Sequence, residues 1–177
     1  MLRLATMADV PTLERLIETS VRRLSVGYYS AAQVDHALRL VFGPDTQLIA
    51  DGTYYVIDEP NSGLVASGGW SRRRTLFGGD QHKASGPDPL LDPLREAARL
   101  RAMFVHPDFA RRGLGRRIFD ACRHAALAAG FSECELAATL PGVPLYTALG
   151  FAATEEFSVP RAEGLALPIV RMRRALA

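Results

Sequence analysis

The stretch from residue 97 to residue 140 constrains the fold of this chain more than any other part of its sequence. An apolar run at 97–105 predicts a strand, and Pro107 must end it because proline cannot donate to a strand ladder. A loop with two glycines follows, and apolar residues at three- and four-residue steps then predict a helix that ends near Ala129. Residues 132–140 have the alternation of another strand. The sequence therefore predicts a strand–helix–strand unit at the centre of the chain.

The segments on either side of this unit extend the predicted fold. They predict, in chain order, a strand at 2–5, a helix capped by Thr6 with apolar positions from Val10 to Val21, a helix at 30–41, strands at 53–57 and 63–70, a short helix at 144–149, and strands at 151–159 and 165–174. Residues 74–93 are rich in glycine, proline and aspartate without apolar periodicity, so we expect a long flexible loop there. This order of elements predicts a single mixed α/β (α+β) domain that spans residues 1–177.

Composition and charge exclude several classes of protein. Hydrophobic residues make up 48% and charged residues 23% of the chain, which provides enough apolar material for a folded core and argues against disorder. No apolar run approaches the ~20 residues of a membrane-spanning helix, and the first residues lack the apolar core of a signal peptide. We therefore expect a cytoplasmic protein without a membrane partner. The net charge of +2 does not indicate a general affinity for nucleic acid.

Two smaller groups of residues bear on ligand binding. Five arginines fall between Arg111 and Arg123, and they could either bind phosphates through their guanidinium groups or form a solvated helix face. Cys122 and Cys134 have neither a CxxC spacing nor a histidine at ligand spacing. We therefore expect two buried, reduced thiols and no metal site.

The junction between the 97–105 strand and the following helix carries the strongest indication of function. The first amides of a helix have no partner within it and lie at the positive end of its dipole. Gly113 and Gly115 would let a ligand approach these amides closely, and arginines flank them. This arrangement is typical of a pyrophosphate-binding loop, although the same glycines could serve only to form a tight turn. The lysine and hydroxyl residue of a P-loop and the full GxGxxG pattern are both missing.

Three stretches, in this order and spacing, resemble the GNAT superfamily of N-acetyltransferases. They are 103–107, 111–115 and 145–151, and together with the N-terminal strand and helix and the final strand they extend the resemblance over nearly the whole chain. The resemblance implies a single-domain fold with a central mixed, mostly antiparallel sheet of about six to seven strands flanked by helices. Two central parallel strands of that sheet would splay apart to hold the cofactor.

The resemblance also implies an activity. Such a protein would move an acetyl group from acetyl-CoA to a primary amine by direct transfer in a ternary complex, with acetyl-CoA (coenzyme A) as co-substrate and no metal. The acceptor would be a small-molecule amine or a protein amine, and the family likeness suggests a homodimer. A non-catalytic acyl-CoA-binding sensor or regulatory module is the alternative.

By position in the family's motifs, three groups of residues would bind acetyl-CoA. The backbone of Met103, Phe104 and Val105 would bond to the pantetheine arm, which would lie there like an added strand. Thr139 stands where a polar side chain commonly follows the second strand. Ala110 occupies the first position of the phosphate loop, where relatives carry Gln or Arg, so one side-chain contact is lost. The pyrophosphate would lie on the loop formed by Arg111, Arg112, Gly113, Leu114, Gly115 and Arg116.

The resemblance assigns the chemistry to a tyrosine. Tyr146 matches the residue with which relatives protonate the departing CoA thiolate, although it could instead pack under the cofactor without proton transfer. The general base is not identified, because Arg99 stands where many relatives have a glutamate. Glu96, Glu135 and His106 are the remaining side-chain candidates, and a water molecule is another. The missing glutamate is what keeps the sensor alternative open.

The acceptor site is the least defined part of this prediction. Tyr28 and Tyr29 lie where relatives often shape the acceptor pocket, and Trp70 would form one of its walls unless it is a core aromatic. The three arginines 72–74 could bind an anionic acceptor or form a solvated charge run. We expect the segment 76–91 to act as a mobile flap on the acceptor side that becomes ordered when substrate binds.

Overall fold

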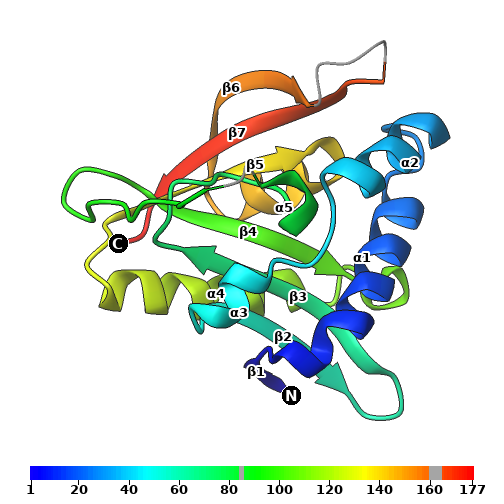
Figure 1. Cartoon of the computed structure of the whole chain (residues 1–177), viewed down its shortest axis with the longest axis horizontal. Helices are drawn as coiled ribbons and strands as arrows, with labels where there is room; N and C mark the ends of the chain where they lie inside the picture. The colour runs from blue at the N-terminus through cyan, green and yellow to red at the C-terminus, as the bar shows by residue number, and fades with distance from the viewer. Residues whose placement is uncertain (84–85, 160–164) are drawn as a thin grey trace.

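A seven-stranded sheet forms the centre of the computed structural model, which describes residues 1–83, 86–159 and 165–177 (Figure 1). Its strands are β1 (Leu2–Leu4), β2 (Tyr54–Glu59), β3 (Gly63–Ser71), β4 (Ala98–Val105), β5 (Glu133–Thr139), β6 (Ala152–Val159) and β7 (Leu167–Ala175). They lie in the order β1-β2-β3-β4-β5-β7-β6, and every neighbouring pair is antiparallel except β4 and β5, which are parallel. The expected mixed, mostly antiparallel sheet with a central parallel pair is confirmed.

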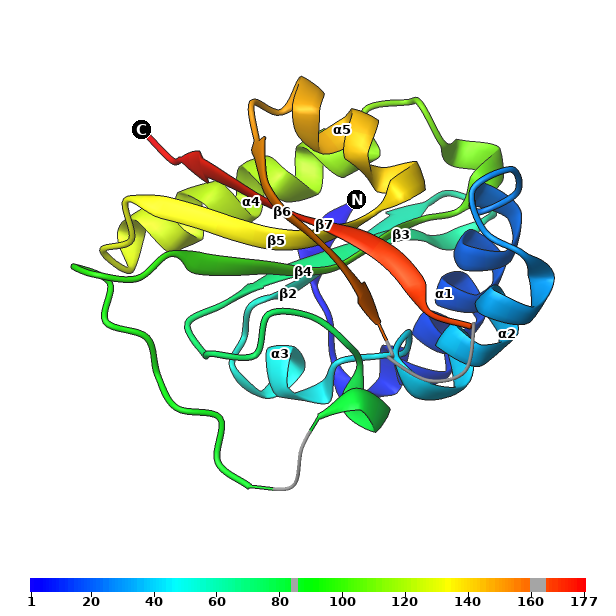
Figure 2. The same cartoon turned by 90° about the horizontal axis from the view of Figure 1, so that it is seen from above.

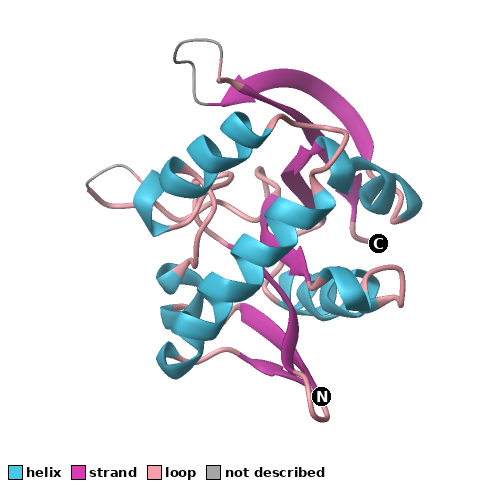
Figure 3. Ribbon diagram, turned by 90° about the vertical axis from the view of Figure 1, so that its right-hand side faces the viewer, coloured by secondary structure: helices cyan, strands magenta, loops and turns pink. Residues whose placement is uncertain are grey.

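Helices cover both faces of this sheet. They are α1 (Val10–Leu24), α2 (Ala31–Leu40), α3 (Thr46–Ala50), α4 (Leu114–Ala128) and α5 (Val143–Ala148). Figure 2 shows α4 on one side of the strands and α3 on the other, and Figure 3 looks onto the side where α1 and α2 lie. α4 packs against β2, β3 and β4, whereas α1 packs against β3 and β4. No helix within the described residues is long and apolar enough to cross a bilayer.

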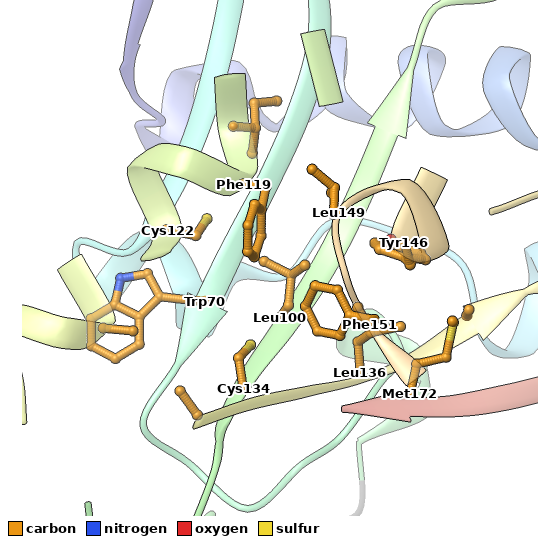
Figure 4. Packing of buried hydrophobic residues seen from close by; sticks show 14 of the residues in the cluster. Trp70, Leu100, Phe119, Cys122, Cys134, Leu136, Tyr146, Leu149, Phe151 and Met172 are labelled. Atoms are coloured by element: carbon orange, nitrogen blue, oxygen red, sulfur yellow. The ribbon is translucent and has the colours of Figure 1, made fainter. Parts of the chain in front are cut away.

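Each face of the sheet has its own hydrophobic core. The larger core lies between the sheet and the helices α4 and α5, and it contains Phe119, Cys122 and Cys134 (Figure 4). A second cluster gathers under α1 and α3 around the fully buried Leu13 and Tyr54, and a third joins α1 and α2 to β6 and β7. Both cysteines are buried free thiols, as the sequence predicted. Burial raises the pKa of both thiols, that of Cys134 to about 12, so they remain protonated at neutral pH.

The short helix α3 was not predicted. Five residues give too little periodicity to indicate a helix from sequence, but the residue before it is a good cap. The Asp45 carboxylate accepts a hydrogen bond from the Leu48 backbone N–H at 3.3 Å, which satisfies one of the free amides of the first turn. The helix α2 is capped as well, since Ser30 Oγ accepts from the Gln33 N–H at 3.2 Å.

The parallel strands β4 and β5 separate soon after they pair. Their ladder consists of two residue pairs, Ala98–Cys134 and Arg99–Glu135. One residue of β3 then stands opposite two residues of β4, which is a β-bulge, and Ala102 adopts a left-handed φ of 54° in it. Beyond the bulge, the edge of β4 that faces β5 has no strand partner within the described residues. The splayed parallel pair thereby leaves a row of backbone groups available to a ligand.

The segment 74–93 is only partly the free loop that the sequence predicted. Its first half packs against the turn between α2 and α3, where the Gly79 N–H donates to the Val41 carbonyl at 2.7 Å and the Asp80 N–H donates to the Pro44 carbonyl at 3.0 Å. These hydrogen bonds anchor the start of the proposed flap. Residues 84–85 lie outside the described residues, and the mobility of the segment stays a prediction.

Candidate functional site

A cleft of about 590 Å³ opens where β4 and β5 separate. Residues 100–105 of β4 form one wall, and the loop 110–116 and helix α5 close one end. The other end is bounded by α1, residues 41–43 after α2, and residues 76–79. The strand–loop–helix junction that the sequence singled out therefore faces the same cavity as the short helix at 143–148.

Most of the residues that the sequence predicted to be functional line the cleft. They are Tyr28, Met103, Phe104, Val105, Arg111, Gly113, Leu114, Gly115, Arg116, Thr139 and Tyr146. Arg112, Tyr29 and Trp70 are not among the residues that line it.

The loop before α4 has the geometry of an anion-binding site. Arg111 and Gly113 both have left-handed φ angles, 63° and 80°, and such a backbone turns successive N–H groups toward one side. A Cβ added to Gly113 would meet no atom within 4 Å, so the space beside this residue is open. The first amides of α4 begin directly after it, and together these donors can hold a phosphate group.

The two glycines of this loop have different roles. A Cβ on Gly115 would lie 2.9 Å from the end of the Leu145 side chain, so that side chain would have to shift. Gly115 therefore permits the close approach of α4 to α5, whereas Gly113 supplies the left-handed turn. The sequence had suggested the same role, ligand approach, for both.

Arg112 and Tyr29 act away from the cavity. The Arg112 guanidinium lies over the Phe109 ring, 5.0 Å from its centroid, so only the Arg112 backbone remains for the loop. The Tyr29 hydroxyl donates to the Pro168 carbonyl at 2.6 Å and accepts from the Leu140 N–H at 2.8 Å. Burial raises the pKa of Tyr29 to about 12. This side chain ties the α1–α2 connection to β7 rather than shaping a pocket.

Trp70 lies in the hydrophobic core, which corrects its predicted place in a pocket wall. Its side chain is 4% exposed and makes an edge contact with Phe131 at 6.0 Å between ring centroids. Figure 4 shows Trp70 at one end of the core cluster and Tyr146 at the opposite end. The structure supports the alternative prediction that Trp70 is a core aromatic. The pleat of β3 directs this side chain toward α4 rather than into the cleft.

Tyr146 has the environment of a neutral proton donor. It lies on α5, lines the cleft and is 8% exposed. Its ring is held by an edge contact with Phe151 at 5.9 Å between centroids. Burial raises the pKa of the phenol above its ordinary value, so the hydroxyl keeps its proton at neutral pH and can donate it.

No carboxylate or imidazole among the described residues lines the cleft. Glu135 forms an ion pair with Arg99, and Glu96 accepts a hydrogen bond from the Asp92 N–H at 2.8 Å. His106 Nδ1 accepts from the Asp108 N–H at 3.3 Å in the turn after β4. Each candidate base from the sequence is therefore held in a contact outside the cavity.

Sequence reasoning missed Phe42 and Arg101, which line the far end of the cleft beside Phe77 of the predicted flap. The only available signal was that Arg101, like Arg99, is a charged residue in a largely apolar strand. Within the described ranges, no group of three or more His, Cys, Asp and Glu side chains is arranged to hold a metal ion.

The chain is similar in sequence to one protein family and in structure to several solved proteins. The sequence model of the acetyltransferase (GNAT) domain matches residues 51–153. A GCN5-related N-acetyltransferase from Rhodopseudomonas palustris is similar over 99% of this chain and 94% of its own, with a TM-score of 0.66 and 18% identity. PaiA N-acetyltransferase from Thermoplasma acidophilum, solved with coenzyme A, is similar over 99% and 98% of the two chains, with a TM-score of 0.64 and 13% identity. YncA from Salmonella typhimurium, solved with its cofactor acetyl-CoA, is similar over 100% and 94%, with a TM-score of 0.63 and 19% identity. No curated protein matches the chain in sequence.

Proposed function

This chain belongs to the GNAT acetyltransferase family, and we propose that it moves the acetyl group of acetyl-CoA to a primary amine by direct transfer in a ternary complex. The observation that carries the proposal is one continuous cleft that brings together the anion-binding loop, the unpaired edge of β4 and Tyr146. The similar structures from T. acidophilum and S. typhimurium hold coenzyme A and acetyl-CoA, which supports the cofactor. In this proposal, residues 1–177 form one N-acetyltransferase domain. Its acceptor is a small-molecule amine or a protein amine.

The proposed cofactor site follows the cleft from β4 to α4. The pantetheine arm bonds to the backbone of Met103, Phe104 and Val105, which has no strand partner on the side of β5. Thr139, at the end of β5, lies across the cleft from them. The pyrophosphate lies on the amides of 111–116, where the backbone is left-handed and open.

Replacing Gly113 with valine should weaken acetyl-CoA binding about tenfold or more, or 1.4 kcal/mol. A β-branched residue resists the left-handed φ of 80°, and its side chain fills the open space into which the phosphates fit. Calorimetric titration with acetyl-CoA measures the change. Gly63→Val is the matched control, because Gly63 has a φ of 69° and equally open surroundings in the hairpin between β2 and β3. Equal affinities of the two folded variants would contradict the assignment.

In the proposed chemistry, the amine attacks the acetyl carbon and Tyr146 donates its phenolic proton to the departing CoA thiolate. The attacking amine must first lose a proton, since an ammonium has no free electron pair. With no carboxylate or imidazole among the described lining residues, this proton leaves to water, as does the second proton that the nitrogen loses after it bonds to the acetyl carbon. The C–S bond breaks as the tetrahedral adduct collapses, Tyr146 protonates the departing sulfur, and a proton from water restores the phenol.

The release of free CoA over a panel of amines tests the function. The enzyme is expected to liberate CoA with at least one amine well above the rate of acetyl-CoA hydrolysis, with the acetylated amine identified by mass spectrometry. Tight acetyl-CoA binding without release for any amine would instead favour the acyl-CoA sensor.

The flap hypothesis for 76–91 has a direct test because Lys83 is the only lysine of the chain. Its ammonium forms ion pairs with Asp45 and, at 3.0 Å, with Asp80, so a lysine-specific protease must open these contacts before it cuts. Acetyl-CoA and an acceptor together should slow the cut several-fold relative to the free protein. The Lys83→Arg variant, which this protease cannot cut there, confirms the site. An unchanged cleavage rate would argue against a flap that closes over substrate.

A further inference from the structure

One buried arginine stands at the end of the cleft away from the phosphate loop. Arg101 lies on β4 four residues before Val105, and it lines the cavity beside Phe42 and Phe77. It is the only charged side chain among the described residues at this end, because the other two in the lining, Arg111 and Arg116, belong to the phosphate loop. The acetyl acceptor must approach from this end if the cofactor occupies the other.

The Arg101 side chain is 1% exposed, yet much of its hydrogen-bonding capacity is unused. Nη2 donates to the Gly78 carbonyl at 2.9 Å and lies 2.7 Å from Asp45 Oδ2, an ion pair rather than an aligned hydrogen bond. Nε and Nη1 are buried and have no partner among the described residues. Burying donors of a charged group without partners is costly, so a site with two such donors favours an occupant that supplies acceptors.

The charge around Arg101 also favours an anion. Asp45 is the carboxylate next to it, but Lys83 forms an ion pair with the same carboxylate. Asp80 contacts Lys83 at 3.0 Å from a side chain that is 42% exposed, where water screens its charge. Asp88 also adds negative charge near Arg101, but its carboxylate accepts a hydrogen bond from the Thr75 N–H at 3.0 Å. Among the described residues, Arg101 forms its ion pair with Asp45. One buried carboxylate is thus paired with two cations, and the described lining of the cleft adds no acidic group.

We propose that the acceptor amine of this enzyme carries an oxyanion, a carboxylate or a phosphate, that pairs with the Arg101 guanidinium. The proposal rests on the acetyltransferase function proposed above and specifies the class of its substrate. The planar guanidinium fork matches the two oxygens of such a group. Phe42 and Phe104, whose rings meet edge-on at 6.2 Å, give this end apolar walls that strengthen the pair.

The same positive charge helps the chemistry. An oxyanion raises the pKa of an ammonium in the same molecule, and pairing of that oxyanion with Arg101 offsets the rise, so more of the bound acceptor is present as the free amine that attacks than without the guanidinium. This effect suits a cleft in which no carboxylate or imidazole of the described residues serves as the base. Arg101 itself stays charged at neutral pH although burial lowers its pKa.

The wild-type enzyme provides the first test. CoA release is measured with each L-amino acid against its carboxamide, with O-phosphoethanolamine against ethanolamine, and with neutral and cationic amines, all as kcat/KM per free amine. At least one anionic member should exceed its neutral partner about tenfold or more, the scale of one charge-assisted hydrogen bond. The amino-acid and phosphate arms tell the two oxyanions apart. Acetylation confined to neutral or cationic amines would overturn the inference and leave the acetyltransferase function intact.

A binding measurement separates this inference from the function itself. The CoA-bound protein is titrated with N-acetyl-amino acids and their carboxamides, and with N-acetyl-phosphoethanolamine and N-acetylethanolamine. Binding of these acetylated products does not depend on catalysis, so the protein is expected to bind the anionic member of each pair more tightly even if no turnover is found. No turnover with any amine would refute the proposed function, whereas equal binding of both members, or none, would refute the role of Arg101.

Variants of Arg101 complete the test. Arg101→Met should bring the anionic-to-neutral ratio from about tenfold or more to near one, while acetyl-CoA affinity is kept. Arg101→Lys keeps the charge beside Asp45 but loses the fork, so it should retain part of the preference and serves if the methionine variant does not fold. Arg15→Met, at an exposed position on α1, is the matched control and should keep the wild-type ratio. A full preference in Arg101→Met would overturn the assignment.

Discussion

Replacing Tyr146 with phenylalanine should lower turnover about 10²-fold or more while acetyl-CoA affinity changes little. The change deletes only the hydroxyl and keeps the ring that packs edge-on against Phe151. If the phenol protonates the departing thiolate, its loss leaves CoA to depart as an unprotonated thiolate in a buried part of the cleft, which is unfavourable in a low dielectric. A tyrosine that only packs under the cofactor would leave the rate nearly unchanged.

The measurement should isolate the chemical step. Single-turnover experiments with preformed enzyme–acetyl-CoA complex avoid slow product release, which could hide the loss. Tyr55→Phe is the control, because Tyr55 is a partly buried tyrosine on β2 that is not among the residues lining the cleft. Near-wild-type single-turnover rates in Tyr146→Phe would exclude the role of general acid.

The parts of the fold that the sequence predicted are those encoded by local pattern. The strand–helix–strand unit carries its own periodicity, its proline stop and its glycine turn, so β4, α4 and β5 lie within a few residues of their predicted bounds. The helix α3 is too short to show a period. The first half of 74–93 is anchored by backbone hydrogen bonds to residues that precede it by more than 30 positions, and such pairing leaves no mark in the local sequence.

The residues of the site show the same difference between local sequence pattern and long-range contacts. The phosphate loop is contiguous in sequence, and the structure gives it an open, left-handed backbone. Trp70 and Tyr29 were misplaced because their roles depend on partners from other elements, Phe131 for one and Pro168 for the other. Arg101 was missed because its partner Asp45 comes from the turn before α3, an element that the sequence did not indicate. The role of a buried charged residue can be assigned only once the fold shows which residue lies beside it.

The stability of the molecule should depend strongly on that partner. Asp45 is fully buried, forms ion pairs with Arg101 and Lys83, and caps α3. Asp45→Asn keeps an oxygen that can cap the helix, since asparagine is as good a cap as aspartate, but it removes the negative charge. Arg101 then loses its ion-pair partner, and among the described residues Lys83 keeps only Asp80, whose side chain is 42% exposed. Because breaking a buried ion pair by removing one partner is strongly destabilising, the free energy of unfolding should fall by about 3–5 kcal/mol.

Chemical denaturation of the variant measures this loss, and two further variants identify its cause. Asp80→Asn removes a carboxylate that also contacts Lys83 but is 42% exposed, so it should cost no more than about 1 kcal/mol. In the double variant Asp45→Asn/Arg101→Met, the uncompensated guanidinium is gone as well. The double variant should therefore be more stable than the sum of the two single effects predicts, by about 1–3 kcal/mol. If Asp45→Asn costs no more than Asp80→Asn, or if the two changes simply add, the buried charge is balanced by other groups and Arg101 does not depend on Asp45.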